Sequence, residues 1–193
     1  MDKRIGITGN FEIWVGDKKI AEGKNRFTRY LMSSIVVIIA STWGSAEIVY
    51  AHYYTRALAY NATARVGKDT ATSTTTTMTD LVDKIDVAPS SITRKLWRSE
   101  AEWKYMAEFL FRWDAGVLPS TTIGEFGVYL TLDSDDWSSP APNPNRCTAG
   151  CPVGGADTRL ASRIASADGK FTEFYYDNTE PLTYIWRLIV QIK

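Results

Sequence analysis

The sequence has little of what the common nucleophilic enzymes require. Its single histidine, His52, stands among tyrosines and is interpreted as a packed or surface ring, and the chain has no G-x-S-x-G motif. A serine or cysteine nucleophile needs a base beside it, so no catalytic triad is predicted. The chain also lacks a P-loop and a G-x-G-x-x-G turn, which excludes the usual nucleotide cradles. We therefore expect a protein that is not an enzyme and that holds no cofactor.

Cysteine is scarce as well. Cys147 and Cys151 lie close together in one stretch of the chain, which is neither a disulfide framework nor a complete zinc site. The two thiols could close a small disulfide ring in an oxidising environment or remain free. Asp133, Asp135 and Asp136 offer oxygen ligands for Ca²⁺, but the further ligands and the terminal glutamate of an EF-hand loop are missing. No metal site is therefore predicted.

The chain has neither a net charge nor a long hydrophobic run. Lysine plus arginine and aspartate plus glutamate number 22 each, so no overall field attracts nucleic acid or anionic lipid. The strongest apolar run, residues 35–40, falls well short of the roughly 20 residues that a membrane span needs. The opening MDKRIGITGN has no apolar run typical of a signal peptide. We expect no nucleic-acid partner and no membrane span.

Alternating apolar residues are what the sequence does have. Residues 121–132, TTIGEFGVYLTL, place Phe126 and Val128 on one face at a period of two, which is typical of a half-buried β-strand. Gly124 and Gly127 predict a bend just before Phe126, because a glycine inside a strand often marks a bulge or a close backbone approach. We expect this strand to be central, with other strands on both sides.

The same alternation predicts strands along most of the chain. A hairpin over residues 3–22 turns at Gly16 and Asp17, and residues 102–114 form a long strand with residues 92–98 as its antiparallel neighbour. The other predicted elements are a helix at 28–43, a strand-rich region at 48–66, an exposed threonine-rich connector at 67–79, a long loop at 133–156, and strands at 160–165, 171–175 and 182–192.

Turn residues predict how some of these elements connect. Residues 114–116 carry the chain from the long strand into the central strand as a meander, and Asp168 with Gly169 turns the chain between the next two strands. Thr28 is predicted to cap the helix and Gly44 to end it.

The predicted fold is all-β. It is a mainly antiparallel β-sandwich with one helix near residues 28–43. The whole chain, 1–193, forms a single domain that carries the long loop at 133–156 as an insertion. The side chains predicted to be buried in its core are Phe109, Phe111, Val128, Leu130, Trp186 and Leu188.

Two features leave functional alternatives open. Glu102, Glu108, Glu125 and Asp114 could converge across strands as a glycosidase pair, but acidic residues that alternate with lysine and arginine are more typical of a solvated sheet face. The seven tryptophans and ten tyrosines could form a sugar-stacking surface. We favour the interpretation that they fill the faces of sheets.

Four stretches carry a resemblance to a known family. They are FEIWVGDKKIAEGKNRFT, VGKDTATSTTTTMTDLVDKI, TIGEFGVYL and LASRIASADGKFTEFYYDNTEPLTYIWRLIVQI. In this order they resemble a loose family of structural proteins of tailed phages and related viruses, found in tail-fibre and other virion-surface genes. The aromatic-rich residues 91–114 and the insertion at 133–156 depart from the pattern of that family.

The resemblance implies a β-sandwich building block without catalytic residues. We therefore expect a structural protein located in the virion, where its partners are copies of itself and other virion proteins, with a host-surface glycan as a further candidate. Balanced charge favours association of identical copies into a homo-oligomer, and sheet edges offer the contacts. The alternative from another class is a carbohydrate-binding β-sandwich module.

The long loop generates a first prediction. Residues 133–156 have too little apolar content to pack by themselves. Deleting them should leave the circular dichroism spectrum and the thermal unfolding midpoint nearly unchanged, while assembly or attachment is lost. A deletion variant that unfolds would instead place this loop in the core.

Overall fold

The structure is a computed structural model, and it describes residues 5–29, 31–32, 62–99, 101, 104–132 and 157–192. Its strands are β1 (Ile5–Val15), β2 (Lys18–Lys24), β3 (Arg26–Phe27), β4 (Ala62–Gly67), β5 (Lys84–Ile85), β6 (Ser91–Ser99), β7 (Lys104–Trp113), β8 (Thr121–Ile123), β9 (Glu125–Leu132), β10 (Asp157–Ala165), β11 (Phe174–Tyr176) and β12 (Leu182–Ile192). Several predictions lie outside the described residues: those for His52, Glu102, Asp133, Asp135, Asp136, Cys147 and Cys151, most of the helix at 28–43, the start of the region at 48–66, and the loop at 133–156.

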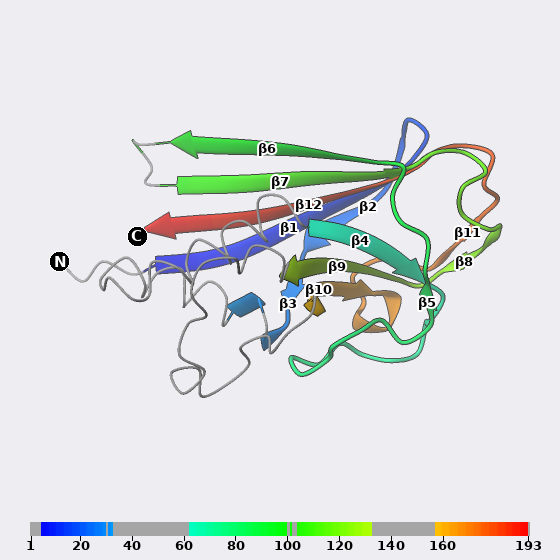
Figure 1. Cartoon of the computed structure of the whole chain (residues 1–193), viewed down its shortest axis with the longest axis horizontal. Helices are drawn as coiled ribbons and strands as arrows, with labels where there is room; N and C mark the ends of the chain where they lie inside the picture. Colours follow the sequence, from blue (N-terminus) through cyan, green and yellow to red (C-terminus); the bar gives the residue numbers. More distant parts are fainter. Residues whose placement is uncertain are drawn as a thin grey trace, which may run out of the picture.

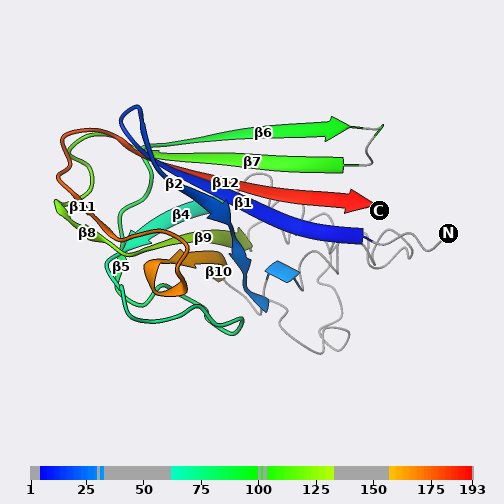
Figure 2. The same cartoon turned by 180° about the vertical axis from the view of Figure 1, so that it is seen from behind.

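Two five-stranded antiparallel sheets form the fold. The first has the order β2-β1-β12-β7-β6 and the second the order β3-β10-β9-β4-β5, while β11 and β8 pair in a small third sheet. The two larger sheets lie one above the other, and the long strands of the first sheet run past the ends of the shorter strands of the second (Figures 1 and 2). The predicted all-β fold with packed antiparallel sheets is therefore confirmed.

The N-terminal hairpin passes from one sheet to the other. β1 and β2 pair around a turn in which Gly16 has φ +55°, as predicted. At the corner between β2 and β3, the amide of Asn25 donates to the carbonyl oxygen of Gly9 at 2.9 Å. A Cβ on Gly9 would lie 2.5 Å from the ring of Phe27, so only a glycine lets β3 bend away here.

The predicted connections between strands need two corrections. β7 does not lead into β9 as a meander, because β7 pairs with β6 and β12 whereas β9 pairs with β4 and β10. The turn at Asp168 and Gly169 exists as a short 3-10 helix, η2 (Ser166–Asp168), but β10 and β11 do not pair with each other. Alternation identifies the buried face of a strand and says nothing of which strand lies beside it.

Aromatic rings fill the space between the two sheets. The rings of Phe109 and Trp186 lie 5.5 Å apart within the first sheet, and Tyr184 reaches the second sheet, where its ring lies 5.0 Å from that of Phe126. All six side chains predicted for the core are buried, and Leu188 is the most exposed of them at 8%. The period-two alternation of these strands therefore identified the core correctly.

Thr28 lies immediately before the first helical residue, as predicted, but its hydroxyl bonds to β10. Its side chain is fully buried, and its hydroxyl donates to the carbonyl oxygen of Leu160 at 2.6 Å, so it ties the chain to β10. The chain becomes helical just after it, where the amide of Met32 donates to the carbonyl oxygen of Thr28 at 3.3 Å.

Two tyrosines of the core offer a matched test of these contacts. The hydroxyl of Tyr184 is buried without a hydrogen-bond partner among the described residues, whereas that of Tyr176 donates to the carbonyl oxygen of Glu180 at 2.6 Å. An unpaired buried hydroxyl costs free energy, and a satisfied one contributes about 1 kcal/mol. Urea unfolding should show that Tyr184→Phe leaves the free energy of unfolding unchanged or higher, while Tyr176→Phe lowers it. A larger loss for Tyr184→Phe would contradict this account.

Candidate functional site

A buried arginine lies on the outer face of the second sheet. The guanidinium of Arg163 donates through Nε to Oε2 of Glu125 at 2.8 Å and through Nη1 to the carbonyl oxygen of Thr72 at 2.8 Å. Its Nη2 lies 2.7 Å from Oε2 of Glu125 and 3.1 Å from Oδ2 of Asp69. The side chains of Arg163 and Glu125 are both 0% exposed. This ion pair is therefore held away from solvent.

The burial is provided by residues 68–83, which we call the strap. The strap crosses the outer face of the second sheet between β4 and β5 (Figure 1). It lies so close that a Cβ on Gly124 would be 2.3 Å from the carbonyl oxygen of Asp69, and a Cβ on Gly67 would be 2.8 Å from that of Asp83. Glycine is needed at both positions because two backbones meet there.

The register between β9 and β10 places the arginine beneath the strap. Arg163 is paired with Gly127, which has no side chain to compete for the space above it. A Cβ on Gly127 would lie 2.8 Å from Leu160 and 2.9 Å from Leu81, so this glycine also admits the apolar part of the strap. The interruption predicted before Phe126 is confirmed at Gly124, between β8 and β9.

Glu125 holds the far end of the strap as well as the arginine. Its Oε1 accepts a hydrogen bond from the amide of Asp83 at 2.9 Å, and its Oε2 accepts one from the amide of Val82 at 3.3 Å. A buried carboxylate is stable when charged donors and backbone amides surround it. Glu125 is therefore fixed from two sides.

Asp168 fixes the middle of the strap. Its side chain is 1% exposed and accepts hydrogen bonds from the amide of Thr74 at 3.1 Å and from the hydroxyl of the same threonine. Arg26 reaches it from β3 with an Nη1 to Oδ1 distance of 3.2 Å. The turn predicted at Asp168 thus serves to hold the strap.

A tyrosine and an aspartate close the last part of the strap. The hydroxyl of Tyr129 donates to Asp80 and accepts from the amide of Leu81 at 3.1 Å. Burial, and then the hydrogen bond to Asp80, raise the pKa of Tyr129 above its usual value. Burial alone would raise the pKa of Asp80, but hydrogen bonds from Lys84, Tyr129 and the Leu81 amide outweigh it and lower that pKa.

A second arginine bridges two carboxylates on the outer face of the first sheet. Arg187 on β12 donates through Nε to Glu108 on β7 at 2.7 Å and through Nη1 to Glu12 on β1. The three side chains are about one-fifth exposed, at 21%, 16% and 17% respectively. Burial would raise the pKa of Glu12, but the hydrogen bonds from Arg187 and Trp14 hold it below its usual value.

The three candidate carboxylates that the structure describes do not lie together. Glu108 pairs with Arg187 in the first sheet, Asp114 pairs with Arg112 at 3.0 Å, and Glu125 belongs to the second sheet. The interpretation of Glu125 as part of a solvated face is wrong, because the strap covers that face. Most of residues 67–79 are exposed, as predicted, but Asp69 and Thr74 tie them to the sheet through Arg163 and Asp168. Among the described residues, no group of histidine, cysteine and acidic side chains could hold a metal ion.

The sequence analysis missed Arg163, Asp69, Thr74 and Asp168 as cooperating residues. The signal was present in three of the quoted stretches, since VGKDT contains Asp69, TIGEFG contains Glu125 and LASRIASADG contains Arg163 and Asp168. Chemically, each nitrogen of the Arg163 guanidinium already contacts an oxygen. The Arg163 guanidinium therefore holds the strap to the second sheet.

Comparison with known proteins links the chain to a virus. It is similar to an uncharacterized protein, ORF274, of Acidianus filamentous virus 1 (isolate United States/Yellowstone), with 30% identity over 130 residues. This match covers 61% of the chain and 43% of the viral protein, so the chain spans under half the length of that relative. A viral origin is therefore suggested. No family model matches the chain, and no solved structure matches it, so the tail-fibre family has no support from these comparisons.

Helices long and apolar enough to cross a membrane are absent from the part of the chain that the structure describes.

The two arginines generate a matched prediction. Arg163→Met leaves Glu125 and Asp69 buried without their cation, which should cost about 3 to 5 kcal/mol of unfolding free energy. Arg187→Met removes a guanidinium from a site where water reaches both carboxylates. The unfolding free energy should therefore fall by less than half as much. Urea unfolding measures both, and limited proteolysis should cut the strap early in Arg163→Met alone. Equal losses of unfolding free energy in the two variants would show that the burial of Arg163 does not affect stability.

Proposed function

We propose that the protein is a structural component of a virus particle and acts through contacts with other virion proteins and with copies of itself. The observation that carries this proposal is the similarity to a viral protein over 130 residues.

The arrangement around Arg163 supports a structural role. Gly67, Asp69, Glu125 and Arg163 come from the stretches that resemble virion proteins, and all four contribute to one buried cluster. Residues arranged in this way hold the molecule rigid. A rigid unit suits a protein that must present the same surfaces in every copy of an assembly.

The positions of the exposed aromatic side chains that the structure describes do not favour a sugar-binding module. Trp97 is 46% and Tyr105 48% exposed, but Trp97 is paired with Met106 while Tyr105 is paired with Arg98. The two rings therefore project from opposite faces of the sheet. Tyr175 lies on β11, at the other end of the molecule from the tip of β6 (Figure 1). These rings do not share one stacking platform.

The proposal predicts that the protein is found in purified particles in a fixed ratio to the coat protein. An antibody against the recombinant chain would follow it through a density gradient of particles from a producing culture, and quantitative mass spectrometry would give its copy number. A host cytosolic protein serves as the control for contamination. A chain that stays at the top of the gradient while the coat protein sediments would contradict a structural role.

A further inference from the structure

Among the described strands, the first sheet ends at a long one. β6 is the last strand in the order β2-β1-β12-β7-β6 and pairs with β7 from Ser91 to Ser99. In both views β6 lies at the border of the sheet, and its far end runs past the ends of β4 and β9 (Figures 1 and 2). An edge strand is a template on which another strand can pair.

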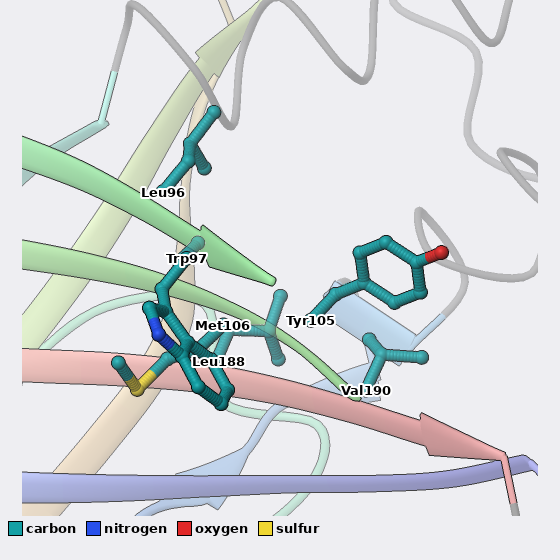
Figure 3. A pocket seen from close by; sticks show the side chains of 7 residues that line it. Leu96, Trp97, Tyr105, Met106, Leu188 and Val190 are labelled. Carbon is teal, nitrogen blue, oxygen red and sulfur yellow. The ribbon is translucent and has the colours of Figure 1, made fainter. Parts of the chain in front are cut away.

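An apolar pocket lies beside the far end of β6. It has a volume of about 440 Å³ and is lined by Leu96, Trp97, Tyr105, Met106, Ala107, Leu188 and Val190. Figure 3 shows these side chains around the ends of β6, β7 and β12. Leu96 is 86% exposed, which is unusual for a leucine in a strand next to an apolar pocket. The pocket is large enough for an apolar side chain.

The charges on the edge have one sign. β6 contains Arg94, Lys95 and Arg98 and no acidic residue. Lys104, at the start of β7, adds a further cation and lies with its Nζ 5.6 Å from the ring centre of Trp97. Lys104 therefore lies beside the pocket, and the charged residues of β6 itself are all basic.

We propose that β6 receives an extended acidic segment of a different protein, which adds a strand to the first sheet and places an apolar side chain in the pocket. Strand addition supplies main-chain hydrogen bonds, a pocket selects alternate side chains, and opposite charges steer the encounter and exclude wrong partners. This proposal rests on the proposed structural role and names the chemistry of one of its partners.

A second copy of the chain fits this edge poorly. If two β6 strands paired antiparallel about their centre, Lys95 of each copy would lie directly opposite Lys95 of the other, and like charges in that position are destabilising. The strand at the opposite edge, β2, has three lysines, Lys18, Lys19 and Lys24, and one acidic residue, Glu22. Glu22 is already paired with Lys19 at 2.8 Å. The charges therefore favour a partner of a different sequence.

The test is the binding of designed peptides to the isolated chain. The probe is a fluorescein-labelled peptide as long as β6 in which glutamate alternates with valine, and fluorescence anisotropy measures its dissociation constant. One control peptide replaces glutamate with lysine. The other keeps the charge but has proline at its centre, which removes a donor and cannot continue a strand. The acidic peptide alone should bind, and binding should weaken as salt is added.

Two charge variants locate the binding edge. Lys95→Glu should weaken binding of the acidic peptide roughly tenfold or more, as close charge pairs at interfaces do. Lys18→Glu makes the same change on the exposed β2 edge of the same sheet and should leave binding unchanged. Leu96→Ser should weaken binding without lowering the thermal midpoint, because this side chain is 86% exposed. Equal thermal midpoints of the variants show that each is folded.

Four results would overturn the proposal. They are equal binding of the proline peptide, equal binding of the lysine peptide, an equal effect of Lys18→Glu, or a dimer of the chain in analytical ultracentrifugation that Lys95→Glu abolishes. Peptide binding is measured on the isolated chain, so its failure would leave the particle measurement standing. Absence from particles would end the structural role even if the acidic peptide binds at β6.

Discussion

The packing of the strap on the second sheet depends on a guanidinium, that of Arg163, that is buried away from water. A buried guanidinium is tolerated only when partners surround it, and here they come from β9 through Glu125 and from the strap through Asp69 and Thr72. The strap must therefore lie flat on the sheet. It can do so because glycines stand where its backbone meets β4, at Gly67, and the junction of β8 and β9, at Gly124. The ion pair needs the strap close to the sheet, and the ion pair in turn holds the strap there. The strap therefore forms a third layer, on the side of the second sheet that faces away from the core.

Such an ion pair adds less to stability than apolar packing would, but it can fix a register. A shift of one residue between two strands turns every side chain to the other face. If β10 shifted in this way, Arg163 would point between the sheets, toward Phe126 and the aromatic rings of the core, where the described residues offer it no carboxylate. The pairing of β10 with β9 contains an irregularity between Leu160 and Ser162, so its register needs a second determinant. The aromatic layer on one side and Arg163 on the other provide it.

The sequence predicted features that depend on one face of one strand. The first hairpin, the antiparallel pair of β6 and β7, the interruption at Gly124 and the six core side chains were all recovered from period-two alternation and turn residues. The alternation on β9 was misleading on one point, because Glu125 and Tyr129 look solvated in a half-buried strand and are covered by the strap. Partners of a strand and layers above a sheet come from residues far apart in the chain, such as Asp69 and Arg163. Spacing within one segment does not contain that information, although the stretches quoted for the family resemblance do include these residues.

The two arginine clusters show that the two sides of the sandwich are built differently. On the second sheet the strap covers Arg163 and Glu125, which are both 0% exposed. On the first sheet Arg187 links three strands through Glu12 and Glu108, and water still reaches all three side chains. An ion pair that bridges β1, β12 and β7 stiffens the sheet without covering it. The first sheet therefore combines an outer face on which Arg187 bridges three strands with an edge strand, β6, whose charged residues are all basic.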